Sequence, residues 1–183
     1  IEKRGKDDIA EKKKKSRDLG DDICILTSKN EHASDRVYGL NEEQEKLAGA
    51  SEKLVKLNNL KGKITQKVAT ITKEHKFFTD NTVCPTCSQN IEEEFRVNRI
   101  ADVQNKAKEL KKDYTDLEET IKLESERERH FTQLSKEITK LNHDISQNNT
   151  RISLNQRQIR ELENEVQKIT EQLKNRTSER HAL

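Results

Sequence analysis

Cys84-Pro85-Thr86-Cys87 is the stretch that decides the fold of this chain of 183 residues. Pro85 is the only proline in the sequence. A proline inside a helix costs about 3 kcal/mol, because its ring removes an N–H group and clashes with the preceding turn. The segments on either side, Asp80–Thr82 and Ser88–Asn90, are typical of turns and helix caps. The chain therefore leaves any helix here, and it carries two cysteines through the turn.

The composition excludes an ordinary globular core. Charged residues make up 38% of the chain and aromatic residues 3%, and there is no tryptophan. Too few large apolar side chains are present to fill a compact interior. The formal net charge of +2 does not by itself predict nucleic-acid binding. Since no run of about 18 apolar residues occurs, we expect no membrane span and no membrane partner.

Apolar residues recur in steps of three and four on both sides of the turn, which is the pattern of a coiled coil. Before the turn they are Ile9, Leu19, Ile23, Leu26, Ala33, Val37, Leu40, Leu47, Ala50, Leu54, Leu57, Ile64, Val68, Ile71 and Phe78. After the turn they are Val103, Ala107, Leu110, Tyr114, Leu117, Ile121, Phe131, Leu134, Ile138, Leu141, Ile145, Ile152, Ile159, Leu162, Val166, Ile169 and Leu173. The sequence therefore predicts an all-α fold, a long antiparallel coiled-coil hairpin within one chain. Its ascending helix would cover residues 1–79, its apex 80–90 and its returning helix 91–183.

A register follows if the hairpin turns about the middle of Cys84–Cys87. Residue numbers of facing partners then add up to 171, and apolar positions face apolar positions along both arms. Leu54 would face Leu117, and Val68 would face Val103. This agreement favours one hairpin over two helices with unrelated partners.

Each arm also contains one place with two consecutive steps of three, which overwinds a coiled coil. This place ends at Glu43 in the first arm and starts at Glu128 in the second, and in the register above the two carboxylates face each other. Gly39, which costs about 1 kcal/mol in a helix, lies close by. We therefore predict a bend or a locally opened segment at Tyr38–Glu43 and Glu128–Phe131.

The two apical thiols predict a zinc site that a single chain cannot complete. Structural zinc takes four ligands, and Cys84 and Cys87 supply two of them. His75 occupies a seam position below the turn, and Cys24 lies 60 residues away along the chain. A second copy would complete a Zn(Cys)₄ site, giving a homodimer with one zinc ion per two chains. A thioredoxin-like redox pair and a metal-free turn are the alternatives, and a thiol pair of any kind suits a reducing, intracellular compartment.

A C-P-x-C apex between long antiparallel arms resembles the zinc hook of the Rad-fifty/SbcC family, which is related to the SMC proteins. The resemblance implies that Cys84 and Cys87 ligate zinc, with Pro85 and Thr86 forming the knuckle between them. It also implies a parent protein that is an ABC-type ATPase, works with a nuclease subunit and acts in the repair and recombination of DNA double-strand breaks. The short arms suggest a phage or bacterial member, and the family implies a cytoplasmic, nucleoid or nuclear location.

The chain itself is not expected to be an enzyme. It begins at Ile1 rather than Met, and it contains no G-x-x-x-x-G-K-[ST] loop, so we interpret it as a segment of a larger protein. Contacts with DNA and with the nuclease would then be made by head domains outside this sequence. The competing interpretation is a coiled-coil scaffold or adaptor whose C-x-x-C pair is incidental or redox-active.

Overall fold

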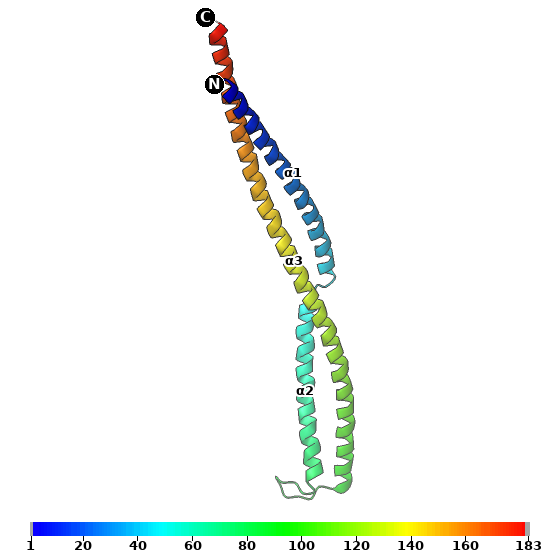
Figure 1. Ribbon diagram of the computed structural model, residues 1–183. Helices are drawn as coiled ribbons and strands as arrows, with labels where there is room; N and C mark the ends of the chain where they lie inside the picture. The colour runs from blue at the N-terminus through cyan, green and yellow to red at the C-terminus, as the bar shows by residue number, and fades with distance from the viewer. Residues whose placement is uncertain (1, 182–183) are drawn as a thin grey trace. The chain divides into compact units, whose positions relative to one another are not determined.

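The structure, a computed structural model, describes the backbone of residues 2–181 and the side chains of residues 3–176. It contains three helices: α1 (Glu2–Glu45), α2 (Ala50–Asp80) and α3 (Glu93–His181). The all-α class is confirmed (Figure 1). Among the described residues, no helix combines the length and the apolar character that a membrane span requires.

The helices form two compact units. One comprises Ile1–Gln44 with Leu134–Leu183, and the other comprises Glu45–Gln133. In the first unit α1 lies against the second half of α3, and in the other unit α2 lies against the first half (Figure 1). Each unit is an antiparallel helix pair, and the expected long helical hairpin, consistent with a coiled coil, is confirmed.

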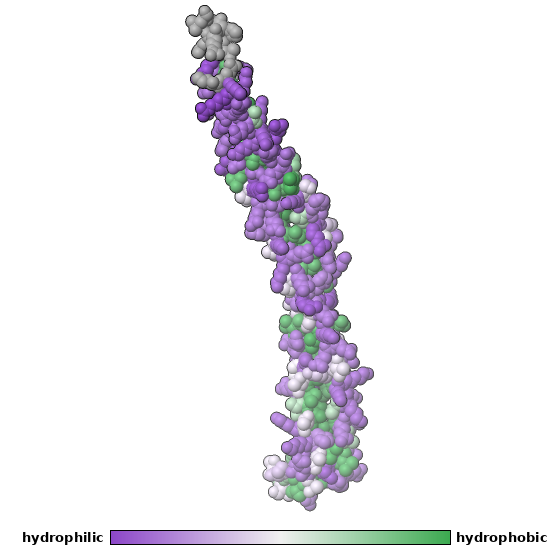
Figure 2. Space-filling view, viewed as in Figure 1, coloured by the Kyte–Doolittle hydropathy of each residue, from purple (hydrophilic) through white to green (hydrophobic). Residues whose placement is uncertain are grey.

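The predicted seam forms the core of both units. The buried apolar side chains all occupy predicted seam positions: Leu26, Leu40, Ala50, Ile64, Val103, Leu117 and Leu134. Elsewhere the visible face is mostly hydrophilic, with hydrophobic residues gathered along the lines where helices meet (Figure 2). Two predicted seam residues, Val68 and Ala107, are exposed instead. Because burying one leucine contributes only about 1.5–3 kcal/mol, this narrow core must be long to be stable.

The helices pair one heptad away from the expected register. The Asn148 side-chain amide donates to the Asn30 amide oxygen at 2.8 Å, so these partners add up to 178 rather than 171. In the other unit the Lys61 ammonium lies 2.9 Å from the Glu118 carboxylate, which gives 179. A heptad pattern repeats every seven residues, so a shift of seven again sets apolar positions against apolar positions. The pairing of Leu54 with Leu117 and of Val68 with Val103 was therefore wrong.

The turn is off-centre, which explains the shift. In the observed register Asp80, the last residue of α2, is level with Asn98. Yet α3 already begins at Glu93, so it extends about one and a half helical turns further toward the tip. The midpoint of the cysteines is consequently not the midpoint of the hairpin.

A polar layer in the seam distinguishes the two registers. Asn30 donates to the Asn149 amide oxygen at 2.9 Å and accepts from Asn148. In the register shifted by seven, Asn30 would face Leu141, and Asn148 would face Ile23. Both amides would then lie against aliphatic side chains, and leaving a buried polar group unpaired costs about 1–3 kcal/mol. This layer therefore favours the observed register.

Replacing both members of this layer with leucine should raise stability and weaken register selection. We expect Asn30→Leu/Asn148→Leu to unfold at a higher urea concentration than the parent, because an apolar layer replaces a polar one. The single variant Asn148→Leu should unfold earlier, since it leaves the Asn30 amide oxygen facing a leucine. The Lys12 ammonium lies 2.6 Å from the Glu165 carboxylate, so zero-length cross-linking of this pair reports the register. The yield of this cross-link should decrease in the double variant. Equal urea midpoints for the single and double variants would contradict this role.

The ascending arm is interrupted, but later than predicted. The chain leaves the helix at Lys46–Gly49, so the arm consists of two helices rather than the one expected. Gly49 has a φ of 80°, a left-handed conformation that glycine adopts without steric cost. Tyr38–Glu43, where we predicted the opening, lies within α1, and α3 remains helical at Glu128–Phe131. An opening of the helix at Tyr38–Glu43 was therefore a wrong prediction, and α3 has no break at Glu128–Phe131.

The phase slip accounts for where the break occurs. The half-buried or buried positions Gln44, Leu47 and Ala50 are separated by two steps of three. In the observed register these positions are level with the slip that begins at Glu128 in α3. Two consecutive steps of three overwind a coiled coil locally, so both helices are disturbed at this level. Glu43, which we expected to face Glu128, is instead exposed.

A charge cluster around one buried carboxylate joins α2 to α3 beside the break. The side chain of Glu124 is 5% exposed, and its carboxylate lies 2.5 Å from the Lys53 ammonium and 3.2 Å from the Arg127 guanidinium. Arg127 also donates to the Lys46 carbonyl oxygen at 3.1 Å. The hydrogen bond from Lys53 holds the pKa of Glu124 below its ordinary value. The two basic groups thereby compensate the charge of a carboxylate that would otherwise be unfavourable in the seam. Arg127 also supplies a hydrogen-bond donor to a carbonyl group that the break leaves without a helical partner.

Candidate metal centre

The two cysteines lie in a tightly hydrogen-bonded turn between α2 and α3. Val83 and Asn90 form an antiparallel bridge, and the Cys84 N–H donates to the Gln89 carbonyl oxygen at 2.8 Å. The Ser88 N–H then donates to the Cys84 carbonyl oxygen at 2.9 Å, which closes the loop around both thiols. Ser88 has a φ of 59°, an uncommon conformation for a residue other than glycine. The backbone thus bends the C-x-x-C segment into a compact knuckle.

Arg96 ties the start of α3 to the end of α2 below this knuckle. Its guanidinium donates to the Phe78 carbonyl oxygen at 3.1 Å and lies 2.9 Å from the Glu93 carboxylate. The Phe78 ring also packs edge-on against Phe77 and Phe95, with centroids 5.1 and 5.9 Å apart. This role of Arg96 was not predicted from the sequence. The signal was Glu93, three residues earlier, at the spacing of a helical ion pair.

The turn favours the thiolate form of Cys84. The backbone N–H groups of Cys87 and Thr86, together with the Cys87 thiol, donate toward the Cys84 sulfur and lower its pKa. Cys84 is half-buried, whereas Cys87 is exposed and lies 3.6 Å from the Gln89 amide oxygen. Hydrogen bonds to the charged form of a group always favour that form. Because a metal binds the thiolate rather than the thiol, one of the two predicted ligands is electrostatically prepared.

The donor set fits half of a structural zinc site. Thiolates bind zinc at about 2.3 Å in tetrahedral sites with four ligands, and these two cysteines are neighbours in the turn. Within the part of the chain that the structure describes, no group of three or more His, Cys, Asp or Glu side chains could hold a metal ion. His75 instead lies 3.5 Å from the Gln104 amide on the helices below, and Cys24 is an exposed residue of α1. The structure thus brings together the two predicted ligands, and the residues that it describes add no third one.

Comparison with protein-family models finds none that matches this chain. Comparison with curated proteins likewise finds no matching sequence. The functional proposal therefore depends on the residues of the turn and on the helices that carry it.

Proposed function

We propose that this chain is a coiled-coil tethering segment that joins two molecules through a shared Zn(Cys)₄ site. Cys84 and Cys87 of each copy would hold the ion. The observation that carries the proposal is the incomplete donor set: two neighbouring thiols, one with a lowered pKa, and no third ligand beside them among the described residues. Zinc bound by four thiolates supplies a link that is firm yet reversible by chelation.

The arrangement of the helices supports a mechanical role for the arms. An antiparallel helix pair holds its turn away from whatever is attached to its ends, at 1.5 Å per residue. The seam supplies a narrow core, and the visible surface outside it is mostly hydrophilic, as expected for a spacer built from paired helices. In this proposal the residues of the chain position two thiolates and perform no reaction.

The resemblance to the Rad-fifty/SbcC zinc hook extends the proposal to the parent protein. That protein would be an SMC-like ATPase subunit that acts with a nuclease on DNA double-strand breaks, and head domains outside this chain would bind DNA. The C-P-x-C turn at the tip of an antiparallel helix pair is the feature that supports this assignment.

Zinc content and molecular mass, measured on the same sample, test the proposal. We expect one zinc ion per two chains and a mass by light scattering twice that of one chain. A chelator should return the mass to that of a single chain, and added zinc, but not magnesium, should restore the dimer because magnesium prefers oxygen ligands. A coiled-coil scaffold would keep the same mass under all these conditions. One zinc ion per monomeric chain would overturn the shared site.

A further inference from the structure

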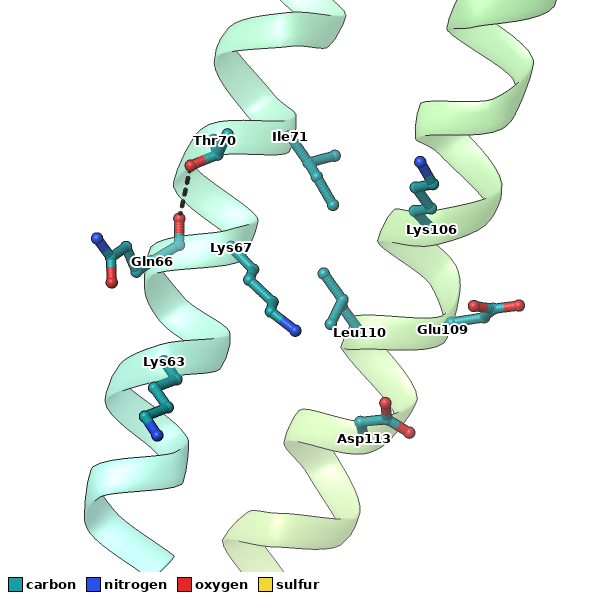
Figure 3. Close-up of a pocket in the computed structure, with 9 residues that line it drawn as sticks. All are labelled: Lys63, Gln66, Lys67, Thr70, Ile71, Lys106, Glu109, Leu110 and Asp113. Carbon is teal, nitrogen blue, oxygen red and sulfur yellow. Dashed lines mark hydrogen bonds between the residues drawn. The ribbon is translucent and has the colours of Figure 1, made fainter.

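A groove runs beside the seam between α2 and α3, within the unit formed by residues 45–133. It has a volume of about 580 Å³, and Ile71 and Leu110 form its apolar floor. Lys63 and Lys67 of α2 line one wall, as Figure 3 shows. The wall contributed by α3 contains Lys106, Glu109 and Asp113. The groove is thus apolar at its base and carries charges on both rims.

The two rims carry opposite charges. Lys56 precedes Lys63 by one heptad and extends the basic rim of α2, and Asp116 follows Glu109 by one heptad and extends the acidic rim of α3. None of these side chains takes part in an ion pair among the described residues. The situation differs in the neighbouring seam, where Lys61 is paired with Glu118 at 2.9 Å. Two stripes of unneutralised, opposite charge therefore lie side by side on one face.

Such a face is complementary to itself under one particular symmetry. A two-fold axis parallel to the helices sets α2 of one copy against α3 of the other, with every residue at the same height. In the observed register Lys67 lies at the height between Glu109 and Asp113, and Lys63 lies between Asp113 and Asp116. The basic rim of each copy then meets the acidic rim of the other copy, so this contact occurs twice, once on each side of the axis.

The charge pattern changes at the end of the groove that lies nearer the tip. Lys106, the basic residue of the α3 wall, is level with Ile71–Glu74. Glu74 follows Lys67 by one heptad, but its carboxylate is already paired within the chain, 2.6 Å from the Arg99 guanidinium. Opposite unpaired charges therefore face each other across the symmetric contact at the heights of Lys63 and Lys67, and the contact is confined to this part of the face.

We infer that two copies joined at their tips pack side by side through this face, the basic rim of α2 in each copy against the acidic rim of α3 in the other. The inference rests on the proposed function for the parallel orientation, since a shared tip places both copies at one height. A second copy fits better than nucleic acid, because phosphates would be repelled by the acidic rim. Exposed ion pairs are individually weak, so this contact aligns arms that the tip already holds together.

Cross-linking of mixed copies tests the contact. The full chain is prepared in unlabelled and ¹⁵N-labelled forms, mixed with zinc and treated at low salt with a zero-length reagent that joins amines to carboxylates. Mass spectrometry then separates links between copies from links within one copy. We expect links between copies from Lys63 to Asp113 and from Lys67 to Glu109. The pair Lys61–Glu118, linked within one chain, serves as the internal standard.

Charge exchange supplies the specificity control. Lys63→Glu/Lys67→Glu should lower the links between copies about tenfold, and Glu109→Lys/Asp113→Lys should do the same, because each variant repels itself. A mixture of the two variants should restore links between positions 63 and 113, since every rim again meets its opposite. Lys73→Glu/Lys76→Glu makes the same charge change away from the groove and should leave the links unchanged. Circular dichroism checks that each variant remains helical.

The outcomes separate this inference from the proposed function. A zinc-dependent mass of two chains without links between copies would overturn side-by-side packing and leave the shared zinc site intact. The expected links in a Cys84→Ser/Cys87→Ser variant would support the face and count against the zinc link. Failure of the mixed variants to regain links would also overturn the inference, because recovery on mixing is its specific consequence.

Discussion

Replacing Cys84 and Cys87 with serine should abolish the zinc-dependent dimer. Structural zinc sites in small peptides contribute about 10–16 kcal/mol of apparent binding free energy, far more than any other contact available to this tip. Serine keeps the size of the side chain but removes the thiolate on which the site depends. Light scattering of the double variant with zinc should therefore give the mass of one chain, and the zinc content should fall to background.

Cys24→Ser is the matched control for this experiment. Cys24 is exposed on α1 and lies outside the tip, so its variant should bind zinc and dimerise like the parent. Acid should dissociate the parent dimer, because protons compete with zinc for the thiolates. The N–H groups that lower the pKa of Cys84 make its thiolate persist to a lower pH than an ordinary thiol would allow. A double variant that dimerised as tightly as the parent would disprove the shared metal site.

Leu40→Ala should cause the largest loss of stability from a single change in the seam. Leu40 is 1% exposed, the most deeply buried leucine of the described residues. Removing a fully buried leucine side chain costs about 2–5 kcal/mol, through lost burial and the cavity left behind. The slightly better helix propensity of alanine recovers only a few tenths of a kcal/mol. The midpoint of urea unfolding, followed by circular dichroism, should therefore fall clearly.

Ile25→Ala provides the comparison within the same helix. Ile25 is 54% exposed, so truncating it removes little buried surface. Alanine is also the better helix former, so this variant should match the parent or exceed it slightly. Similar losses for the two variants would show that α1 is not held by the seam described here.

The buried stripe of the helices and the position of the turn were predictable from the sequence. Buried residues such as Leu26 and Leu117 occupy positions that the heptad pattern predicted. The position of the cysteines in the turn was also predictable, because Pro85 cannot continue a helix and polar turn formers surround it. What these elements do in the cell is still a prediction.

The pattern was less informative about the interruption of the first arm. Two consecutive steps of three predicted a disturbance of the coiled coil. Two placements of these steps, one heptad apart, fitted the apolar pattern of the first arm equally well. The chain breaks at Gly49, where a left-handed φ is required, and not near Gly39, which remains helical. The stabilising contacts of Arg127 with Lys46 and of Lys53 with Glu124 join segments that are far apart in the sequence. No local pattern contains them.

Three properties could be predicted from the sequence: that this chain is helical, which stripe of each helix is buried, and where the chain turns back with its two thiols. Those properties follow from local rules, namely heptad spacing and the geometry of proline. The register was decided only in the tertiary structure, because a pattern that repeats every seven residues fits equally well after a shift of seven residues. The choice depends on contacts such as the pairing of Asn30 with Asn148, which exists only when both arms are present.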